Sequence, residues 1–472
     1  MTGEYHLLVV MKFGGRSVGG AEAFRNVVAL ISNYASANDL VVVTSAMNGV
    51  TNSLIEAATR ASQRDEKHVA EVTEQLRTRH QNVCEQVITR TDEIKRTNAQ
   101  LDLELRELEK ALTGVSYLGE LTPRSLDYVL SFGEKLSTLV LAGALHDSGV
   151  SVQRLTGEEA GIVTDASFGE ATPLMTVTQP KLEKKLCPLI KDRKIPVITG
   201  YIAATEDGVP TTLGRGGSDY TATIIGSALR ADEVWIWTDV DGIMTADPKI
   251  EHAAQTIREI SFMEAMEMSH FGAKAMHPRA LEPAAKIGLP VRVKNTFNPN
   301  GPDTLILQDQ RIKSVNVVKA VTSVKEASMI TVSGAGMHGA PGTAAKVLDV
   351  LGKNDVSVLM ISQSSSEANI SLVIARSNLE RATAALKESL LKESLFKEIT
   401  SEADVSIVAA VGAGMKGTRG IAARIFRAVA DEGVNIKMIA QGSSELNVSF
   451  VVREDDVLKS VHALHEEFRL GD

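Results

Sequence analysis

Short apolar runs alternate with amphipathic stretches over about the first 300 residues of the chain. The runs are continuous rather than alternating, which is typical of strands buried on both faces of a parallel sheet. These predicted strands are residues 7–13, 40–44, 195–199, 233–237 and 290–294. Helical spacing between the runs, as in 21–37, predicts helices on both faces of that sheet. The pattern therefore predicts a three-layer α/β domain over residues 1–305.

One stretch interrupts this alternation, at residues 63–112. It contains no Gly or Pro and is rich in Glu, Lys, Arg, Gln and Leu. Such a composition predicts long amphipathic helices, which we expect to form a hairpin inserted over the sheet domain. Its simplest interpretation is a solvated, charged helical surface without chemistry.

The last third of the chain contains one sequence block twice. The block at 334–374 recurs at 412–452 without a gap, most visibly as Gly334-Ala-Gly-Met337 and Gly412-Ala-Gly-Met415. A long unit used only twice indicates a duplicated small domain, because solenoids need more and shorter repeats. The order of apolar runs and glycine turns predicts a ferredoxin-like βαββαβ plan for each copy. The two predicted domains span residues 318–395 and 400–472.

Composition and charge exclude several classes of protein. The chain is 44% apolar and 23% charged, and its net charge of −9 argues against a nucleic-acid partner. Cys84 and Cys187 are far apart and offer neither a disulfide framework nor zinc-ligand spacing. The sequence contains no leader pattern and no apolar run of ~20 residues. We therefore expect a cytoplasmic, multi-domain protein with no membrane partner.

Two glycine-rich segments follow predicted strands of the first domain. They are Lys12-Phe-Gly-Gly-Arg-Ser-Val18 and Thr212-Leu-Gly-Arg-Gly-Gly-Ser-Asp-Tyr220. Glycines at the carboxyl ends of strands let backbone amides approach phosphate oxygens. An arginine enclosed by glycines, as Arg215 is, suits bidentate capture of a carboxylate or phosphate. Two structural alternatives remain: the first segment could be only a tight turn, and Ser218 and Asp219 could simply cap a helix.

Three further segments carry candidate residues: Ser131-Phe-Gly-Glu134, Trp237-Thr-Asp-Val-Asp-Gly242 and Phe271-Gly-Ala-Lys274. The aspartates of the second segment fail the spacing of a calcium hand, so a turn that wraps a nucleotide is favoured. Lys274 is a candidate phosphate cation, whereas Glu134 could be only a first-turn helix acid. No Cys/His or Ser/His/Asp arrangement accompanies these cations. The sequence thus favours phosphoryl transfer over nucleophilic catalysis by the protein.

In combination and in order, these motifs resemble those of the aspartate kinase family. The resemblance covers essentially the whole chain and is to the monofunctional type with two C-terminal ACT domains, especially the archaeal threonine-sensitive enzymes. It implies an amino-acid-kinase domain followed by an ACT domain in each repeat. The implied reaction is transfer of a phosphoryl group from ATP to the β-carboxylate of L-aspartate. The product, 4-phospho-L-aspartate, leads to lysine, threonine, methionine and isoleucine.

The resemblance also implies roles for the residues that match its motifs. Lys12 would neutralise the transferring phosphoryl group, Asp219 would hold Lys12, and Arg215 would bind the substrate's α-carboxylate. Further aspartate-binding residues would be Ser45, Thr51 and Glu134. The nucleotide-binding residues would be Gly14, Gly15, Thr238, Asp239, Met244, Lys249 and Lys274. Mg²⁺ would bridge the ATP phosphates with no dedicated protein ligand.

Three positions depart from the family pattern. The family usually has Thr in place of Arg16, and commonly has Tyr in place of Met244 and Arg in place of Lys249. Met can pack on an adenine face and Lys249 keeps the charge. Arg16 is a long cation within the glycine loop, where it could contact a phosphate.

For the repeat, the resemblance implies regulation by an end-product amino acid, threonine before lysine. The implied effector-binding residues are Gln363 and Asn369, with their counterparts Gln441 and Asn447. We expect the first copy to bind more strongly, because Asp355 adds a carboxylate for an ammonium group. Sheet edges in such domains usually pair, which predicts a homodimer or homotetramer through the ACT domains.

Two other interpretations compete with this one. A kinase acting on glutamate or a carbamate would not account for the combination of glycine motifs with two ACT domains. A catalytically inactive amino-acid sensor would have no need of Lys12, Glu134, Arg215 and Asp219 together.

Overall fold

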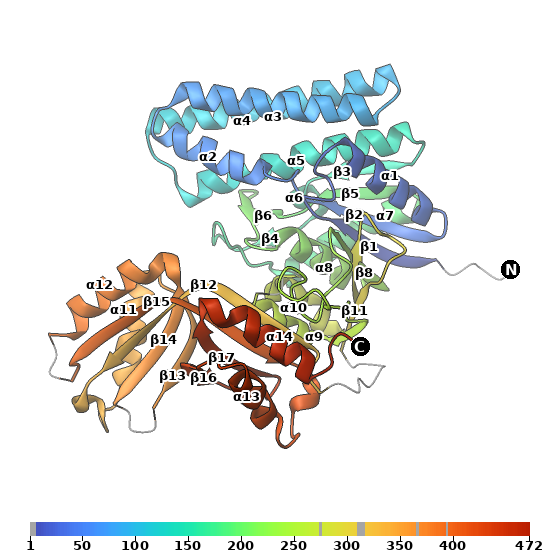
Figure 1. The fold of residues 1–472 in the computed structure, drawn as a ribbon. Coiled ribbons are helices and arrows are strands. Elements are labelled where there is room, and N and C mark those ends of the chain that lie inside the picture. The colour runs from blue at the N-terminus through green and yellow to red at the C-terminus, as the bar shows by residue number, and fades with distance from the viewer. Residues whose placement is uncertain (1–5, 273–275, 309–316, 365–367, 393–394) are drawn as a thin grey trace. The chain divides into compact units, whose positions relative to one another are not determined.

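The computed structural model describes residues 6–272, 276–308, 317–364, 368–392 and 395–472 (Figure 1). The chain divides into two compact units, which we describe separately. The first unit comprises Met1–Ile243, Arg258–Phe262 and Ala275–Arg311. The second comprises Met244–Ile257, Met263–Lys274 and Ile312–Asp472. Two segments from the predicted range 1–305 therefore belong to the second unit.

The first unit is built around an eight-stranded sheet, and the predicted three-layer α/β class is confirmed. Its strands, in spatial order, are β3 (Val152–Leu155), β5 (Ile195–Thr199), β2 (Asn38–Thr44), β1 (Leu7–Phe13), β8 (Glu233–Thr238), β10 (Val291–Asn295), β11 (Thr304–Leu307) and β9 (Glu259–Ser261). The first six are parallel, and β11 runs antiparallel to β10. Residues 9–11, 13 and 41–43 are fully buried, as the continuous apolar runs predict.

Helices cover both faces of this sheet. One face contacts α1 (Ala21–Ala35) and α5 (Pro123–Asp147); the other contacts α7 (Met175–Lys191) and α8 (Gly217–Leu229), with α10 (Pro278–Ile287) packed on α8. A small second sheet contains β4 (Val163–Thr164), β6 (Ile202–Thr205) and β7 (Pro210–Thr212), and the short helix α6 is Gly157–Ala160. Among the described helices, α5 alone is long and apolar enough to cross a bilayer, but 83% of that stretch is buried, as expected for a core helix.

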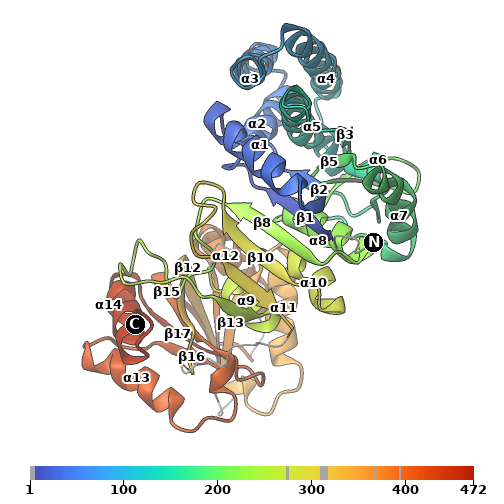
Figure 2. The same ribbon diagram turned by 90° about the vertical axis from the view of Figure 1, so that its right-hand side faces the viewer.

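Residues 63–112 fall in two long helices, α3 (Glu66–Val87) and α4 (Thr91–Leu118). They pack on each other and on α5, and α2 (Val50–Ser62) packs against the same group. Figure 2 shows α3 and α4 nearly end-on beside α5. Leucines at 101, 105, 108 and 112 of α4 are fully buried. The hairpin is therefore part of the core as well as a solvated surface.

The second unit contains a six-stranded antiparallel sheet. Its order is β13 (Val358–Gln363), β14 (Asn369–Ala375), β12 (Ala320–Ser333), β15 (Glu398–Val411), β17 (Asn447–Arg453) and β16 (Met438–Ala440). The helices are α11 (Thr343–Lys353), α12 (Leu379–Leu390), α13 (Ile421–Asp431) and α14 (Val457–Glu467), and α9 (Phe262–His270) belongs to this unit from residue 263 onward.

The two sequence copies share their central strands. The second half of β12 pairs with the first half of β15, and the first half of β12 pairs with the second half of β15. Each long strand thus contributes to both copies, so the second copy is completed by residues that precede the first. Met337 and Met415, the methionines of the duplicated motif, are buried in the two corresponding apolar cores.

Candidate active site

A cavity of about 560 Å³ lies at the carboxyl ends of β1, β2 and β5 in the first unit. In parallel sheets this edge is where ligands bind. Seven residues predicted from sequence line it together: Lys12, Gly15, Ser45, Thr51, Glu134, Arg215 and Asp219. They come from four separate segments of the chain, so the cavity is assembled by the topology of the sheet and not by proximity in sequence.

Lys12 and Asp219 form an ion pair in this cavity. The Lys12 ammonium lies 2.5 Å from an Asp219 carboxylate oxygen, and the two side chains are only 9% and 13% exposed. Helix α8 begins at Gly217, with Gly216 as its N-cap and no side-chain capping bond. The alternative that Ser218 and Asp219 simply cap the helix is therefore wrong. Asp219 lies in the first turn, where the helix dipole favours a carboxylate, and orients Lys12.

The glycines around Arg215 are required by the backbone and by close packing. Gly214 and Gly216 have φ of +74° and +68°, in the left-handed region. A Cβ on Gly216 would lie 2.6 Å from the Cβ of His277, and one on Gly217 would lie 2.5 Å from the Tyr201 ring. Arg215 itself is exposed at the cavity. Its guanidinium forms no ion pair within the part of the chain that the structure describes, so its donors face the cavity without competition.

A buried aspartate that the sequence did not indicate holds this loop in place. Asp127 of α5 accepts hydrogen bonds from the Thr212 amide (2.9 Å), the Thr212 hydroxyl (2.7 Å) and the Gly169 amide (2.9 Å). Burial raises the pKa of Asp127, although these hydrogen bonds oppose the shift. Asp127 thereby ties the strand that leads into the Arg215 loop to the central helix.

Glu134 lies in the middle of α5, so the alternative that it is a first-turn helix acid is wrong. It is 4% exposed, and its Oε2 has no hydrogen-bond partner among the described residues. Burial raises the pKa of Glu134 to about 8, while the Ala46 amide and the charge of Lys12 lower it only in part. A buried carboxyl with a spare acceptor at a cavity wall is typical of a binding site for a donor group.

The glycine loop after β1 lies beside the end of β8. The Gly14 amide donates to the Trp237 carbonyl oxygen at 3.1 Å, and a Cβ on Gly15 would lie 3.0 Å from the Ala46 carbonyl oxygen. Thr238 and Asp239 follow Trp237 at this point but do not line the cavity.

Arg16, which departs from the family pattern, forms an ion pair with Asp239. Partial burial raises the pKa of Asp239, but the hydrogen bond and charge of Arg16 outweigh it, and the net shift is downward. The long side chain of Arg16 thus neutralises a predicted nucleotide-binding carboxylate.

Three further predicted nucleotide-binding residues are Met244, Lys249 and Lys274. Met244 and Lys249 belong to the second unit, and Lys274 lies outside the described residues. The Lys249 amide donates to the Asp247 carboxylate at 2.9 Å. Over the described ranges, no group of three or more His, Cys, Asp or Glu side chains is arranged to hold a metal ion.

Tyr201 also lines the cavity and was missed by the sequence prediction. It has φ of +66° in the turn after β5, and its amide donates to the Thr221 hydroxyl at 3.0 Å. Burial raises the pKa of its hydroxyl to about 12. The sequence could have indicated it, because Gly200-Tyr201 directly follows the predicted strand 195–199. Position at the carboxyl end of a predicted strand was also the criterion that identified Lys12.

The predicted effector residues of the two copies differ in their surroundings. Gln363 and Asn369 of the first copy are exposed, as is Asp355. In the second copy Gln441 is exposed, but Asn447 is buried and donates through its amide to Glu267 of α9.

The glycine motif of the second copy also receives a carboxylate from α9. Glu264 is fully buried; its Oε1 accepts from the Ala413 amide at 2.6 Å, and its Oε2 lies 3.6 Å from the Lys319 ammonium. Ala335, the counterpart of Ala413, has no such carboxylate partner among the described residues. In the second copy, Glu264 and Glu267 of α9 therefore accept hydrogen bonds from the Ala413 amide and the Asn447 side chain. The equivalent groups of the first copy stay accessible.

Comparison with known proteins identifies similar sequences over the whole chain. Residues 8–295 match the amino acid kinase family, and residues 330–390 and 408–468 match an ACT domain. Aspartokinase 1 of Arabidopsis thaliana, a chloroplastic protein, is 33% identical over 476 residues, which cover 98% of this chain and 81% of that protein. The bifunctional aspartokinase/homoserine dehydrogenase 1 of Zea mays is 33% identical and covers 98% of this chain. The chain spans about half the length, 50%, of that bifunctional relative.

Aspartokinase III of E. coli has a similar structure. Its complex with aspartate and ADP, in the R-state, superposes with a TM-score of 0.81 at 28% identity, covering 98% of this chain and 100% of that one. The same protein has been solved with lysine and aspartate in the T-state, also at a TM-score of 0.81.

Proposed function

The chain belongs to the amino acid kinase family, within it to the aspartokinases with two ACT domains, and on this premise we propose that it phosphorylates L-aspartate. The γ-phosphoryl group of ATP is transferred to the β-carboxylate, which gives 4-phospho-L-aspartate and ADP. The observation that carries the proposal is the convergence of Lys12, Asp219, Arg215 and Glu134 on one cavity. Aspartate and ADP are the ligands of the similar E. coli aspartokinase III.

The cavity offers a separate partner for each end of an amino acid. Arg215 binds the α-carboxylate through its fork of N–H donors. Glu134 accepts from the α-ammonium group through the oxygen that has no partner in the described structure. The hydroxyls of Ser45 and Thr51 hold the remaining polar atoms. With both ends of the backbone held, the β-carboxylate is left as the nucleophile.

Phosphoryl transfer needs charge neutralisation more than protein nucleophiles. An oxygen of the β-carboxylate forms the new bond to the γ-phosphorus as the bond to the leaving ADP oxygen breaks. Lys12 neutralises charge on the transferring group, and Asp219, 2.5 Å away, keeps its ammonium in place. Amides at the N-terminus of α8 add positive potential on the same side.

The nucleotide binds beside the glycine loop and the end of β8. Gly14 and Gly15 leave the backbone bare there, and Thr238 and Asp239 offer a hydroxyl and a carboxylate. Mg²⁺ binds phosphate oxygens with few protein ligands, and the oxygen-only donors at this place fit it. When bound, the ion supplies charge neutralisation on the phosphates.

The repeat acts as the sensor of an end-product amino acid, for which threonine is our first candidate and lysine our second. Lysine is bound by the E. coli relative in its T-state. The first copy is favoured as the effector site, because Asp355, Gln363 and Asn369 are exposed there, whereas α9 occupies the equivalent polar groups of the second copy. A cytoplasmic homodimer or homotetramer and the archaeal threonine-sensitive subtype stay predictions.

A hydroxamate assay tests the proposed reaction. The protein with ATP, Mg²⁺ and L-aspartate should form aspartyl hydroxamate, while L-glutamate in the same mixture should give none. Activity with glutamate alone would favour the other kinase interpretation, and no activity with either would favour the inactive sensor. Adding threonine, lysine or both to the active mixture then identifies the effector.

A further inference from the structure

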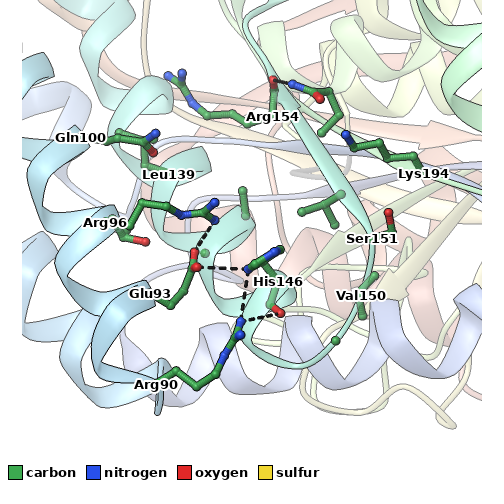
Figure 3. A pocket seen from close by; sticks show the side chains of 16 residues that line it. Arg90, Glu93, Arg96, Gln100, Leu139, His146, Val150, Ser151, Arg154 and Lys194 are labelled. Atoms are coloured by element: carbon green, nitrogen blue, oxygen red, sulfur yellow. Dashed lines mark hydrogen bonds and ion pairs between the residues drawn. The ribbon is translucent and has the colours of Figure 1, made fainter.

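The first unit contains a second, larger cavity, of about 780 Å³, near the C-terminal end of α5 (Figure 3). It lies at the amino ends of β3 and β5, whereas the candidate active site lies at the carboxyl ends of the strands. Its walls come from α4, α5, β3 and the residue before β5. Nothing in the proposed kinase reaction uses this cavity.

Positive side chains dominate its walls. Arg90, Arg96, Arg154 and Lys194 line it, and Glu93 is the single carboxylate among the lining residues. This excess stands out because the chain as a whole has a net charge of −9. Like charges placed around one space repel each other unless a ligand or solvent ions compensate them.

The one carboxylate is already engaged. Glu93 is 3% exposed; its Oε1 accepts from Arg96 at 2.5 Å and its Oε2 lies 3.0 Å from His146 Nδ1. Arg90 pairs with Asp147, outside the cavity, at 3.0 Å and donates to the His146 carbonyl oxygen. Figure 3 shows the contacts that join Arg96, Glu93, His146 and Arg90 along one wall. These pairs fix the geometry of that wall.

The opposite wall presents Arg154 and Lys194. Arg154 pairs with Glu104 at 3.3 Å through one terminal nitrogen, while its Nε is buried and has no hydrogen-bond partner among the described residues. The Lys194 side chain forms no ion pair within the described part of the chain and is partly exposed at the cavity. Lys194 is therefore the cation of this wall that has no carboxylate partner in the described structure, whereas Arg154 is compensated by Glu104.

From this arrangement we infer that the second cavity binds a small anion bearing phosphate or carboxylate groups, held by the Lys194 ammonium and by the N–H donors that the paired arginines still have free. Arginine forks and a lysine ammonium are suited to both groups. The volume is in the range of small-molecule sites, ~300–1,000 Å³. Among the described residues, no Phe, Tyr or Trp side chain lines the cavity. The inference does not depend on the proposed kinase activity.

Isothermal titration of the full-length protein, at low salt and with saturating ADP to fill the nucleotide site, tests the inference. The probes are pyrophosphate and citrate in separate titrations, which distinguish a phosphate from a carboxylate ligand. The test variant is Lys194→Gln. Its matched control is Lys191→Gln, which makes the same charge change at an exposed position on the end of α7.

We expect saturable 1:1 binding of at least one probe to the wild type and to Lys191→Gln. Lys194→Gln should bind about tenfold more weakly, the loss of one charge-assisted hydrogen bond, and 0.5 M NaCl should weaken wild-type binding by about as much or more. Thermal unfolding checks that both variants are folded. No saturable binding of either probe, or equal affinity of the two variants, would overturn the inference.

Discussion

The candidate active site and the second cavity share helix α5, but their walls carry different charges. In the active site, two cations (Lys12 and Arg215) face three acids (Glu134, Glu170 and Asp219). The second cavity is lined by four cations and one acid; three of the cations are paired with Glu93, Glu104 and Asp147, and Lys194 has no ion-pair partner in the described structure. An amino acid carries a positive and a negative group, so its site needs both acidic and basic side chains. An anion needs only basic side chains. The charge pattern of the walls therefore indicates the ligand better than size does, because the larger cavity is not the one that fits aspartate.

The largest effect expected from this comparison is at Lys12. Lys12→Met removes the cation that we propose to neutralise the transferring phosphoryl group, and it leaves Asp219 without its ion-pair partner. We expect kcat to fall by about 10²–10³-fold, the usual loss when one transition-state donor is removed. The measurement is the hydroxamate assay at saturating ATP and aspartate.

Lys191→Met is the control for this prediction, because it removes a lysine from the exposed end of α7. It should keep wild-type kcat. If Lys12→Met retained more than a tenth of wild-type kcat, Lys12 would not be the neutralising residue and the contrast between the two cavities would lose its main support.

A second prediction concerns Arg215, a cavity cation that has no ion-pair partner among the described residues. Arg215→Lys keeps the charge but loses the bidentate fork, so the KM for aspartate should rise about tenfold while the KM for ATP stays unchanged. Steady-state kinetics with each substrate varied separately measures both. Arg230→Lys, at the opposite end of α8, is the control and should change neither. An increase in the KM for ATP alone would place Arg215 on the nucleotide instead.

The third prediction is a pH dependence from Glu134. Burial raises the pKa of Glu134 to about 8, so the carboxyl is mainly protonated below that pH and ionised above it. Only the ionised Glu134 carboxylate can both accept hydrogen bonds through its two oxygens and attract the positive charge of the substrate's ammonium group. The KM for aspartate should therefore fall as the pH rises through about 8. In Glu134→Gln the KM should be high and nearly independent of pH over the same range.

The same shift predicts the sign of a stability effect in the unliganded protein. Since the pKa is 4.5 in the reference state and about 8 in the folded protein, the fold binds the extra proton between these values. The free energy of unfolding should fall as the pH rises from 4.5 to 8. Denaturant unfolding of wild type and Glu134→Gln measures this, and a parallel pH profile in the two would contradict the assignment.

Sequence pattern predicted much of the first unit for a clear reason. Continuous apolar runs define buried parallel strands, and the chemistry lies where those strands end, so Lys12, Ser45 and the Arg215 loop could be placed at one edge. Tyr201 carried the same signal. Asp127 did not, because its hydrogen bonds join α5 to loops 42 and 85 residues away and leave no local motif.

Two other features were beyond the reach of the sequence pattern. The second cavity draws its cations from three separate segments, each of which is an ordinary charged surface by itself. In the repeat, the pattern of each copy predicts its elements but not that β12 and β15 are shared between them. Both the second cavity and the shared strands depend on which distant segments pack or pair together. The periodicity within one segment carries no information about such long-range contacts.

The two copies of the repeat also differ in whether their polar groups already have carboxylate partners. This difference leads to the prediction with the smallest expected effect. Gln363→Ala in the first copy should raise the half-inhibitory concentration of the effector about tenfold, the loss of one or two hydrogen bonds. Gln441→Ala in the second copy should change it by less than about twofold, because Glu264 and Glu267 of α9 already occupy the polar groups around it. The measurement is inhibition of the kinase reaction by threonine and by lysine.

Each variant serves as the matched control of the other, since the two residues are counterparts 78 positions apart. Inhibition that survives in Gln363→Ala and vanishes in Gln441→Ala would reverse the assignment of the effector site. An equal loss of inhibition in both variants would mean that the effector displaces the carboxylates of α9 from the second copy when it binds. In that case Glu267→Gln, which weakens the contact to Asn447, should strengthen inhibition. If the α9 carboxylates instead keep their contacts in the second copy, Glu267→Gln should have no effect on inhibition.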